Sequence, residues 1–162
     1  MIKLFYTAAY IITADFTNER FNDMTEFGNT KNERRERVFQ MLFSLDFNKD
    51  RSVDDSFASF FDENDTMPGE GYLRNTLCGA YSYISEADNL IEADSKNWST
   101  DRMSGVTRSI LRLGIYELLC TELPPKVAIS EAVELAKKFG DDQEPAFING
   151  ILNRIARQQG KL

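Results

Sequence analysis

The 162-residue chain contains no histidine. Histidine is the commonest general base and the commonest metal ligand, so its absence argues against an enzyme and against a metalloprotein. The chain also lacks the GxxxxGK[ST], GxSxG and GxGxxG motifs, which mark nucleotide-binding and hydrolase sites. We therefore expect a noncatalytic protein that holds no metal and no cofactor.

Cysteine is scarce as well. The two cysteines, Cys78 and Cys120, lie far apart in the sequence, and neither belongs to a CxxC pair. A metal site or a redox pair built on cysteine is therefore not expected, and free thiols are typical of proteins in the reducing cytosol. Because a free cysteine behaves as a small apolar residue, we expect both side chains in the core.

The chain also has no excess of positive charge. It carries 19 basic and 26 acidic residues, which gives a formal net charge of -7. Since this global charge disfavours nonspecific adhesion to nucleic acid, any contact with nucleic acid must be local. The hydrophobic content of 42% in 162 residues is enough for one domain with its own core.

Residues 1–23 differ in composition from the rest of the chain. Lys3 precedes an apolar run, residues 4–14, which resembles a short signal-peptide core but lacks a clean small-x-small cleavage site. The run is too short to span a membrane. We therefore expect a cytoplasmic protein in which translation truly starts at Met24. Residues 1–23 would then be an extension with little structural role, and their deletion should leave Tm nearly unchanged.

Helical periodicity runs through the chain from residue 30 onward, and no alternation with a period of two appears there. Helices are predicted from residues 30–32 through Leu45, over 53–61, 71–94, 109–120 and 125–139, and from Pro145 onward. Ser99, Thr100 and Asp101 are start signals for the helix that contains residues 109–120. That segment is apolar nearly all round except at Arg112 and Glu117, so it should be the central helix.

The segment PPKVAISEAVELAKKFG, residues 124–140, has one apolar face and one charged face. Gly140 should end the helix in the left-handed conformation. Lys137 and Lys138 lie in the last turn, where a cation suits the negative end of the helix dipole. From the residues alone two interpretations stay open for these lysines, namely dipole-matched solvation and a contact with phosphate.

The acidic residues predict no metal site. Residues 46–57, DFNKDRSVDDSF, imitate a calcium loop. However, Arg51 stands where the loop needs glycine for its sharp turn, and Phe57 stands where a bidentate glutamate should complete the coordination. Glu131 and Glu134 share one helix face by spacing, and we expect both to lie on a solvated surface.

Three blocks of sequence resemble, in the same order, the transcription antitermination factor NusB family. They are RRERVFQMLF at 34–43, SILRLGIYEL at 109–118, and VAISEAVELAKKFG at 127–140, which continues into FINGIL at 147–152. The resemblance spans residues 31–157, and the last two blocks are very specific. It implies an all-α domain over residues 30–159, with about seven helices in two packed subdomains and no catalytic activity.

The resemblance also implies partners. Members of the family bind the boxA RNA element together with NusE, a small-subunit ribosomal protein, and support read-through by RNA polymerase, notably on ribosomal RNA operons. The expected partners are therefore boxA-type single-stranded RNA, NusE and the RNA polymerase antitermination complex. No membrane and no small-molecule substrate is expected.

The family's RNA-facing segments map onto Arg34, Arg35, Arg37, Lys137, Lys138 and Phe147. Guanidinium groups pair with phosphates, and an aromatic side chain at a helix start can stack on an unpaired base. For Phe147 the alternative is burial in the core. For the face that meets the partner protein the resemblance suggests Phe43 and Arg108, again with burial as the alternative for Phe43.

The sequence departs from the family pattern in two places. Glu33 and Glu36 interrupt the arginines, so the segment KNERRER holds four basic and two acidic residues, and tight RNA binding by this chain alone is not expected. Glu144 and Pro145 replace the small hydroxyl residue that usually precedes the Phe-x-Asn-Gly segment. Pro145 suits a first helical turn, but no hydroxyl group remains there to make the usual contact.

Two other functions are compatible with the same helices. One is a helical scaffold that binds only proteins. The other is the NusB-like domain that precedes a methyltransferase in some ribosomal-RNA modification enzymes, although the chain has no room for a cofactor-binding sheet or a catalytic cysteine motif. RNA binding that depends on the basic residues would separate the first alternative from an antitermination factor.

Overall fold

The computed structural model describes residues 31–60, 70–94 and 99–162, and within these ranges it contains helices and no strand. The elements are α3 (Lys31–Phe47), α4 (Val53–Ala58), α5 (Glu70–Ser82), α6 (Ile84–Asp94), the 3-10 turn η1 (Thr100–Arg102), α7 (Gly105–Cys120), α8 (Pro125–Phe139) and α9 (Glu144–Gln158). The predicted all-α class is therefore confirmed. The expectations about residues 1–23 and Met24 concern positions outside the described ranges.

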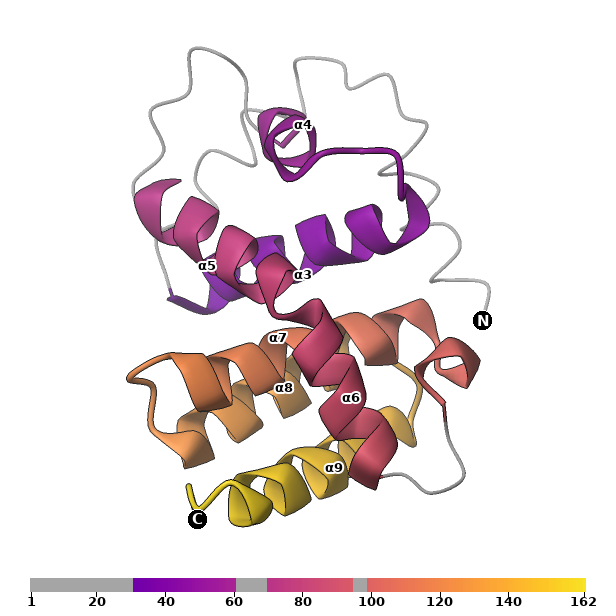
Figure 1. Ribbon diagram of the computed structural model, residues 1–162, viewed down its shortest axis with the longest axis vertical. Coiled ribbons are helices and arrows are strands. Elements are labelled where there is room, and N and C mark those ends of the chain that lie inside the picture. Colours follow the sequence, from indigo (N-terminus) through magenta and orange to yellow (C-terminus); the bar gives the residue numbers. More distant parts are fainter. Residues whose placement is uncertain (1–30, 61–69, 95–98) are drawn as a thin grey trace.

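The helices form two packed groups (Figure 1). Helices α3, α4 and α5 contact one another in one group, and α7, α8 and α9 contact one another in the second. Helix α6 runs across the front of α7 and α9. Helix α7 contacts α3, α5, α6, α8 and α9, and its side chains are buried on most sides, which confirms it as the central helix.

The long helix predicted over residues 71–94 is divided at Tyr83 into α5 and α6. Backbone hydrogen bonds continue through the break, from Tyr83 N–H to Gly79 O and from Ala87 N–H to Tyr83 O. The change of direction lets α5 pack on α3 and α4 while α6 packs on α7 and α9. Because the apolar stripe continues through the break, the periodicity did not reveal it.

Two predicted helix ends differ from the structure. Ser104 caps α7, since its Oγ accepts the Thr107 N–H at 3.0 Å. Of the predicted start signals, Ser99 precedes the 3-10 turn η1, and Thr100 and Asp101 belong to it. Gly140 ends α8 in an extended conformation, with φ -98° and ψ -179°, so the left-handed conformation predicted for it is wrong. A side chain at Gly140 would overlap the Glu144 carboxylate, which explains why glycine fits this position.

Both cysteines are exposed, so their predicted place in the core is wrong. The buried face of α5 is formed by Leu73, Thr76, Leu77 and Ala80, which leaves Cys78 on the outside. Cys120 is the last residue of α7, where the helix reaches the surface.

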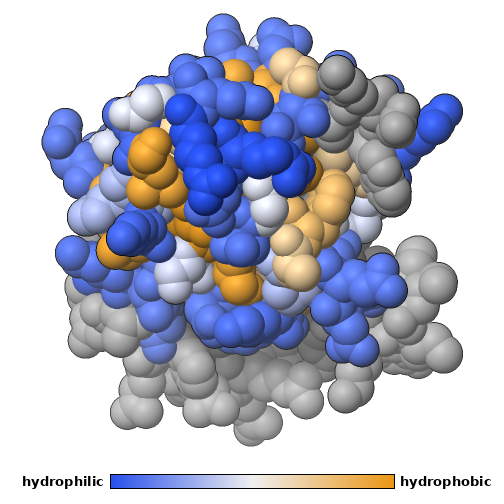
Figure 2. Space-filling view, turned by 90° about the horizontal axis from the view of Figure 1, so that it is seen from below, coloured by the Kyte–Doolittle hydropathy of each residue, from blue (hydrophilic) through white to orange (hydrophobic). Residues whose placement is uncertain are grey.

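The outer faces of the helices are polar, as the periodicity predicted. In α9, Ile148, Ile151 and Ile155 are buried, while Arg154 and Arg157 are exposed. On the face seen in Figure 2, hydrophilic residues predominate and hydrophobic residues are visible in smaller areas between them. None of the helices in the described ranges is long and apolar enough to cross a membrane.

Candidate nucleic-acid interface

Arg35 lies in the interior, where α3 meets α7 and α8. It is 4% exposed, and its Nε donates to both carboxylate oxygens of Glu117 at 2.8 and 2.9 Å. Its Nη1 donates to Glu131 at 2.9 Å. A guanidinium enclosed in this way cannot reach RNA unless its ion pairs with Glu117 and Glu131 break, so the structure argues against Arg35 as an RNA ligand.

The two acidic partners of Arg35 differ in their surroundings. Glu117 is buried, and burial raises the pKa of its carboxyl group, while the charge and hydrogen bonds of Arg35 oppose that rise. Glu131 is half-buried and bound to Arg35, so the prediction that it is simply solvated is wrong. Glu134, by contrast, has a side chain that is 61% exposed, as predicted.

The other two arginines of α3 are also less accessible than the sequence suggested. Arg37 is buried and Arg34 is half-buried, and each makes interactions of its own. Of the three arginines that the resemblance places toward RNA, Arg34 alone keeps part of its side chain on the surface.

Lys137 and Lys138 are exposed on the last turn of α8, with side chains 58% and 60% accessible. Lys137 Nζ contacts Glu134 one turn earlier on the same helix at 2.6 Å. Lys138 Nζ contacts both carboxylate oxygens of Glu36 on α3 at 2.7 Å. Both ammonium groups therefore face solvent on one side and a carboxylate on the other.

Phe147 lies in the first turn of α9 and is half-buried against the core. It also lines a hollow of about 750 Å³ between the start of α7 and the loop that joins α8 to α9. Arg102, Gln143 and Asp142 line the same hollow. Phe147 therefore combines the two environments that the sequence left open, with one part of the ring packed and another part facing a cavity.

Glu144 joins the starts of α7 and α9. Its Oε2 accepts the Asp141 N–H at 3.0 Å, and its Oε1 accepts hydrogen bonds from the hydroxyl groups of Ser104, at 2.7 Å, and Thr107. A carboxylate that reaches back three residues to a free N–H resembles half of a capping box. A carboxylate cap thus takes the place of the hydroxyl group that the sequence lacks here, and the Asp-x-x-Glu spacing could have indicated it.

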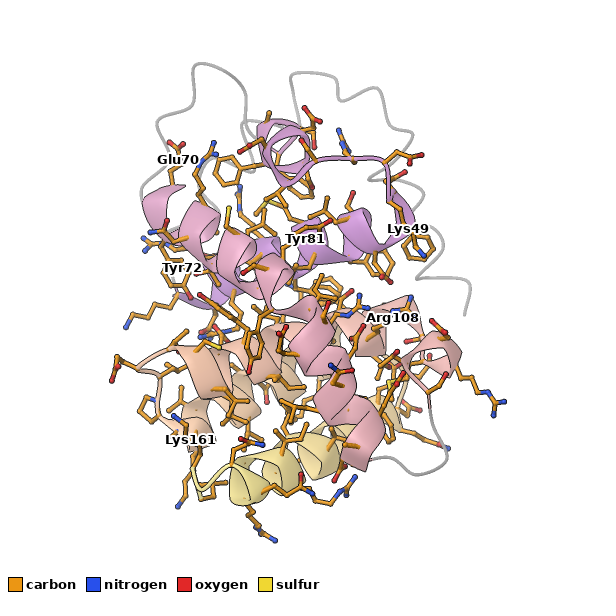
Figure 3. All side chains as sticks on the ribbon, in the orientation of Figure 1. Lys49, Glu70, Tyr72, Tyr81, Arg108 and Lys161 are labelled. Carbon is orange, nitrogen blue, oxygen red and sulfur yellow. The ribbon has the colours of Figure 1, made fainter. Side chains whose placement is uncertain are left out.

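Arg108 makes its contacts within the chain. Its Nε donates to Asp46 at 3.0 Å, its Nη2 donates to the same carboxylate, and its Nη1 donates to Thr100 O at 2.9 Å. Figure 3 shows it on α7 where the two helix groups meet. These contacts use the guanidinium internally, so the structure argues against Arg108 as a partner contact.

Asp46 is held by two arginines, because Arg112 Nη1 also donates to it at 2.8 Å. The two arginines hold the pKa of Asp46 below its usual range, although burial acts in the opposite direction. Asp46, the first residue of the segment that resembles a calcium loop, therefore belongs to α3 and to an ion-pair network.

Phe43 is half-buried between two other aromatic rings of α3. Its ring centroid lies 6.2 Å from that of Phe39 and 4.9 Å from that of Phe47. Phe47 is 60% exposed, which makes it the accessible aromatic residue of this row. The four-residue spacing of the three phenylalanines could have indicated the row, whereas the exposure of its last member depends on the end of α3.

Three of the predicted RNA-contact residues lie where α8 ends and α9 begins. Lys137, Lys138 and Phe147 flank the short loop between α8 and α9, and the Glu36–Lys138 contact joins this loop to the start of α3, where Arg34 lies. We call Lys137, Lys138 and Phe147 the basic-aromatic surface. Reasoning from sequence did not predict that Glu36 contacts Lys138 of this surface.

Comparison with known proteins identifies the same region as a family domain. The model of the NusB family matches residues 32–157. The "Transcription antitermination protein NusB" of Thermoanaerobacter sp. (strain X514) is 37% identical over 130 residues, which covers 80% of this chain and 92% of that protein. The protein of the same name from Anaeromyxobacter sp. (strain Fw109-5) is 41% identical over 128 residues, covering 75% of this chain and 86% of that protein.

Solved structures of NusB proteins are also similar to this chain. The structure of T. maritima NusB matches with a TM-score of 0.74 at 33% identity, covering 83% of this chain and 97% of that one. NusB in the crystal structure of antitermination factors NusB and NusE in complex with dsRNA matches with a TM-score of 0.68 at 27% identity, covering 79% of this chain and 96% of that one.

Proposed function

Since the chain belongs to the NusB family, we propose that it is a noncatalytic transcription antitermination factor that binds boxA-type single-stranded RNA together with the ribosomal protein NusE. In this role it supports read-through by the RNA polymerase antitermination complex, notably on ribosomal RNA operons. The similar chain that was crystallised with NusE and dsRNA supports RNA and NusE as the two classes of partner.

The observation that carries the RNA assignment is the basic-aromatic surface. Lys137 and Lys138 present ammonium groups to solvent within one loop of Phe147, whose ring lines a hollow. Lysines neutralise phosphates, and an aromatic face can stack on an unstacked base. The two kinds of contact lie at the adjoining ends of α8 and α9, so a single strand passing the loop can meet both.

The salt dependence of binding tests the phosphate contacts. We expect a variant with Arg34→Ala, Lys137→Ala and Lys138→Ala to bind a boxA-type RNA oligonucleotide more weakly, with NusE present. The slope of log K against log salt should flatten by about 0.7 for each phosphate that the variant no longer neutralises. Lys126→Ala is the matched control, because Lys126 is an exposed lysine in the first turn of the same helix.

Phe147→Ala tests the stacking contact separately. We expect it to weaken RNA binding by about 1–3 kcal/mol with little change in the salt slope. Because the ring is also packed, the free energy of unfolding should fall as well, and binding must be measured well below Tm.

The alternative of a scaffold that binds only proteins predicts a different result. If the triple variant and wild type bind RNA with the same affinity and the same salt slope in the presence of NusE, the RNA assignment is wrong. Arg35 is left unchanged in this experiment, because its removal would test folding rather than RNA contact.

A further inference from the structure

Glu36 and Lys138 form a tertiary ion pair at the edge of the basic-aromatic surface. The Lys138 Nζ lies 2.7 Å from both carboxylate oxygens of Glu36, although the two residues are 102 positions apart in sequence. The Glu36 side chain is 23% exposed and the Lys138 side chain 60% exposed, so the ammonium is open to solvent from the side away from α3.

The helices beneath this ion pair are fixed to each other. Phe39, one turn after Glu36 on α3, packs on Phe139 of α8 with ring centroids 4.9 Å apart. The Lys138 Nζ also lies 5.5 Å from the centroid of the Phe139 ring. The carboxylate and the ring together hold the ammonium at one place, because the backbone on both sides is anchored by the aromatic contact.

The pair between Lys137 and Glu134 provides a comparison. It lies within one helix at a spacing of three residues, and both side chains are more than half exposed. Such pairs are weak, because two long side chains must be ordered in water. The carboxylate of Glu36 is set on a different helix and is less exposed, so it stays beside Lys138 when the lysine moves toward another anion.

We propose that Glu36 competes with RNA phosphate for Lys138 and thereby lowers the affinity of the free chain for RNA. This inference rests on the proposed function. A phosphate that approaches the open side of Lys138 must share the ammonium with Glu36, and the Glu36 carboxylate places a like charge close to the phosphate. The contact therefore yields less free energy than an unpaired lysine would give. The chain should therefore bind RNA less tightly than it would without the Glu36 carboxylate.

The test is the affinity of Glu36→Gln for a boxA-type single-stranded RNA oligonucleotide, measured across a salt series without NusE and with it. We expect the affinity of the chain alone to rise about two- to five-fold, the factor that corresponds to an exposed ion pair. The salt slope should steepen by up to about 0.7, because one more cation is available to phosphate.

Two further variants separate competition from a general effect of charge. Glu122→Gln makes the same change of charge at an exposed position in the loop before α8, at the opposite end of that helix, and should leave affinity unchanged. In a Lys138→Ala background, Glu36→Gln should have little further effect on affinity.

The outcomes distinguish this inference from the proposed function. If wild type binds RNA with NusE but Glu36→Gln does not tighten binding, the competition is refuted and the RNA assignment stands. Competition for Lys138 would also be refuted if Glu36→Gln raised RNA affinity equally in the Lys138→Ala background, or if Glu122→Gln raised it equally in the wild type. If wild type and Glu36→Gln both bind no RNA even with NusE, the proposed function fails, and this inference fails with it.

Discussion

Replacement of Arg35 by alanine should destabilise the fold rather than remove an RNA contact. The guanidinium is 4% exposed and binds Glu117, which is 3% exposed, so the variant would leave a carboxylate buried without its cation. Removal of one partner of a buried ion pair typically costs about 3–5 kcal/mol. For a domain of this size, a loss of that magnitude lowers Tm by roughly 6–20 °C.

The stability lost in Arg35→Ala should depend on pH, and the ionisation of Glu117 decides whether the loss grows or shrinks as pH rises. Burial already raises the pKa of this carboxyl group above its ordinary value, and Arg35 opposes the rise, so the pKa should increase further in Arg35→Ala. A carboxyl group with a raised pKa in the folded state favours folding when it is protonated, and this contribution is lost as pH rises through that pKa. The difference in Tm between wild type and variant should therefore be larger at about pH 8 than at about pH 5.5.

Thermal and urea unfolding, followed by circular dichroism, measure the effect. Lys137→Ala is the control, because an exposed ion pair typically contributes less than about 1 kcal/mol. The double variant Arg35→Met with Glu117→Leu should regain most of the lost stability, since apolar pairs often replace buried ion pairs at no cost. It should also bind RNA as wild type does. A loss below about 1 kcal/mol in Arg35→Ala, or a loss that does not change with pH, would refute the reasoning.

Three further predictions follow from local contacts. Gly79→Ala should cost about 1–3 kcal/mol of stability, because its Cβ would overlap the Tyr116 hydroxyl. Gly71→Ala is the control in the same helix, since its Cβ meets no atom within 4 Å and should not destabilise the fold. Equal Tm values for the two variants would contradict this prediction. Glu144→Ala should lower the free energy of unfolding by about 1–3 kcal/mol, measured in urea, because donors at the starts of α7 and α9 lose a charged acceptor; an unchanged value would show that water replaces it. Millimolar calcium should leave Tm unchanged, because Asp46 is held by two arginines, and a rise in Tm would reveal a site.

The sequence predicted the helices well where the apolar stripe and the packing face coincide. α8 runs over Pro125–Phe139, as the spacing of its apolar residues and its first-turn proline indicated. The break at Tyr83 was not predictable in this way, because α5 and α6 keep one continuous stripe although α5 packs on α3 and α4 and α6 packs on α9. A local pattern shows which residues are buried, but it does not show against which partner.

At the candidate site, too, the local pattern did not show which distant residues come into contact. Lys137 and Lys138 lie in the last turn of an amphipathic helix, opposite its apolar face, so their exposure was predictable. Arg35 belongs to a charged run that suggests a solvated surface, yet its two partners are 82 and 96 residues away in the sequence. Only the tertiary fold brings Glu117 and Glu131 to the guanidinium.

Arg35 and Arg112 therefore have a different role from the surface lysines. Arg35 binds carboxylates on α7 and α8, and Arg112 joins Asp88 of α6 to Asp46 of α3. A planar guanidinium is weakly hydrated and can donate to two carboxylates at once, which suits it to the contacts between the helix groups. An ammonium group is strongly hydrated and stays at the surface, as in Lys138. The Arg35 contacts fix α3 against α8 close to Glu36, so the arginine-rich start of α3 helps to position the carboxylate that Lys138 contacts.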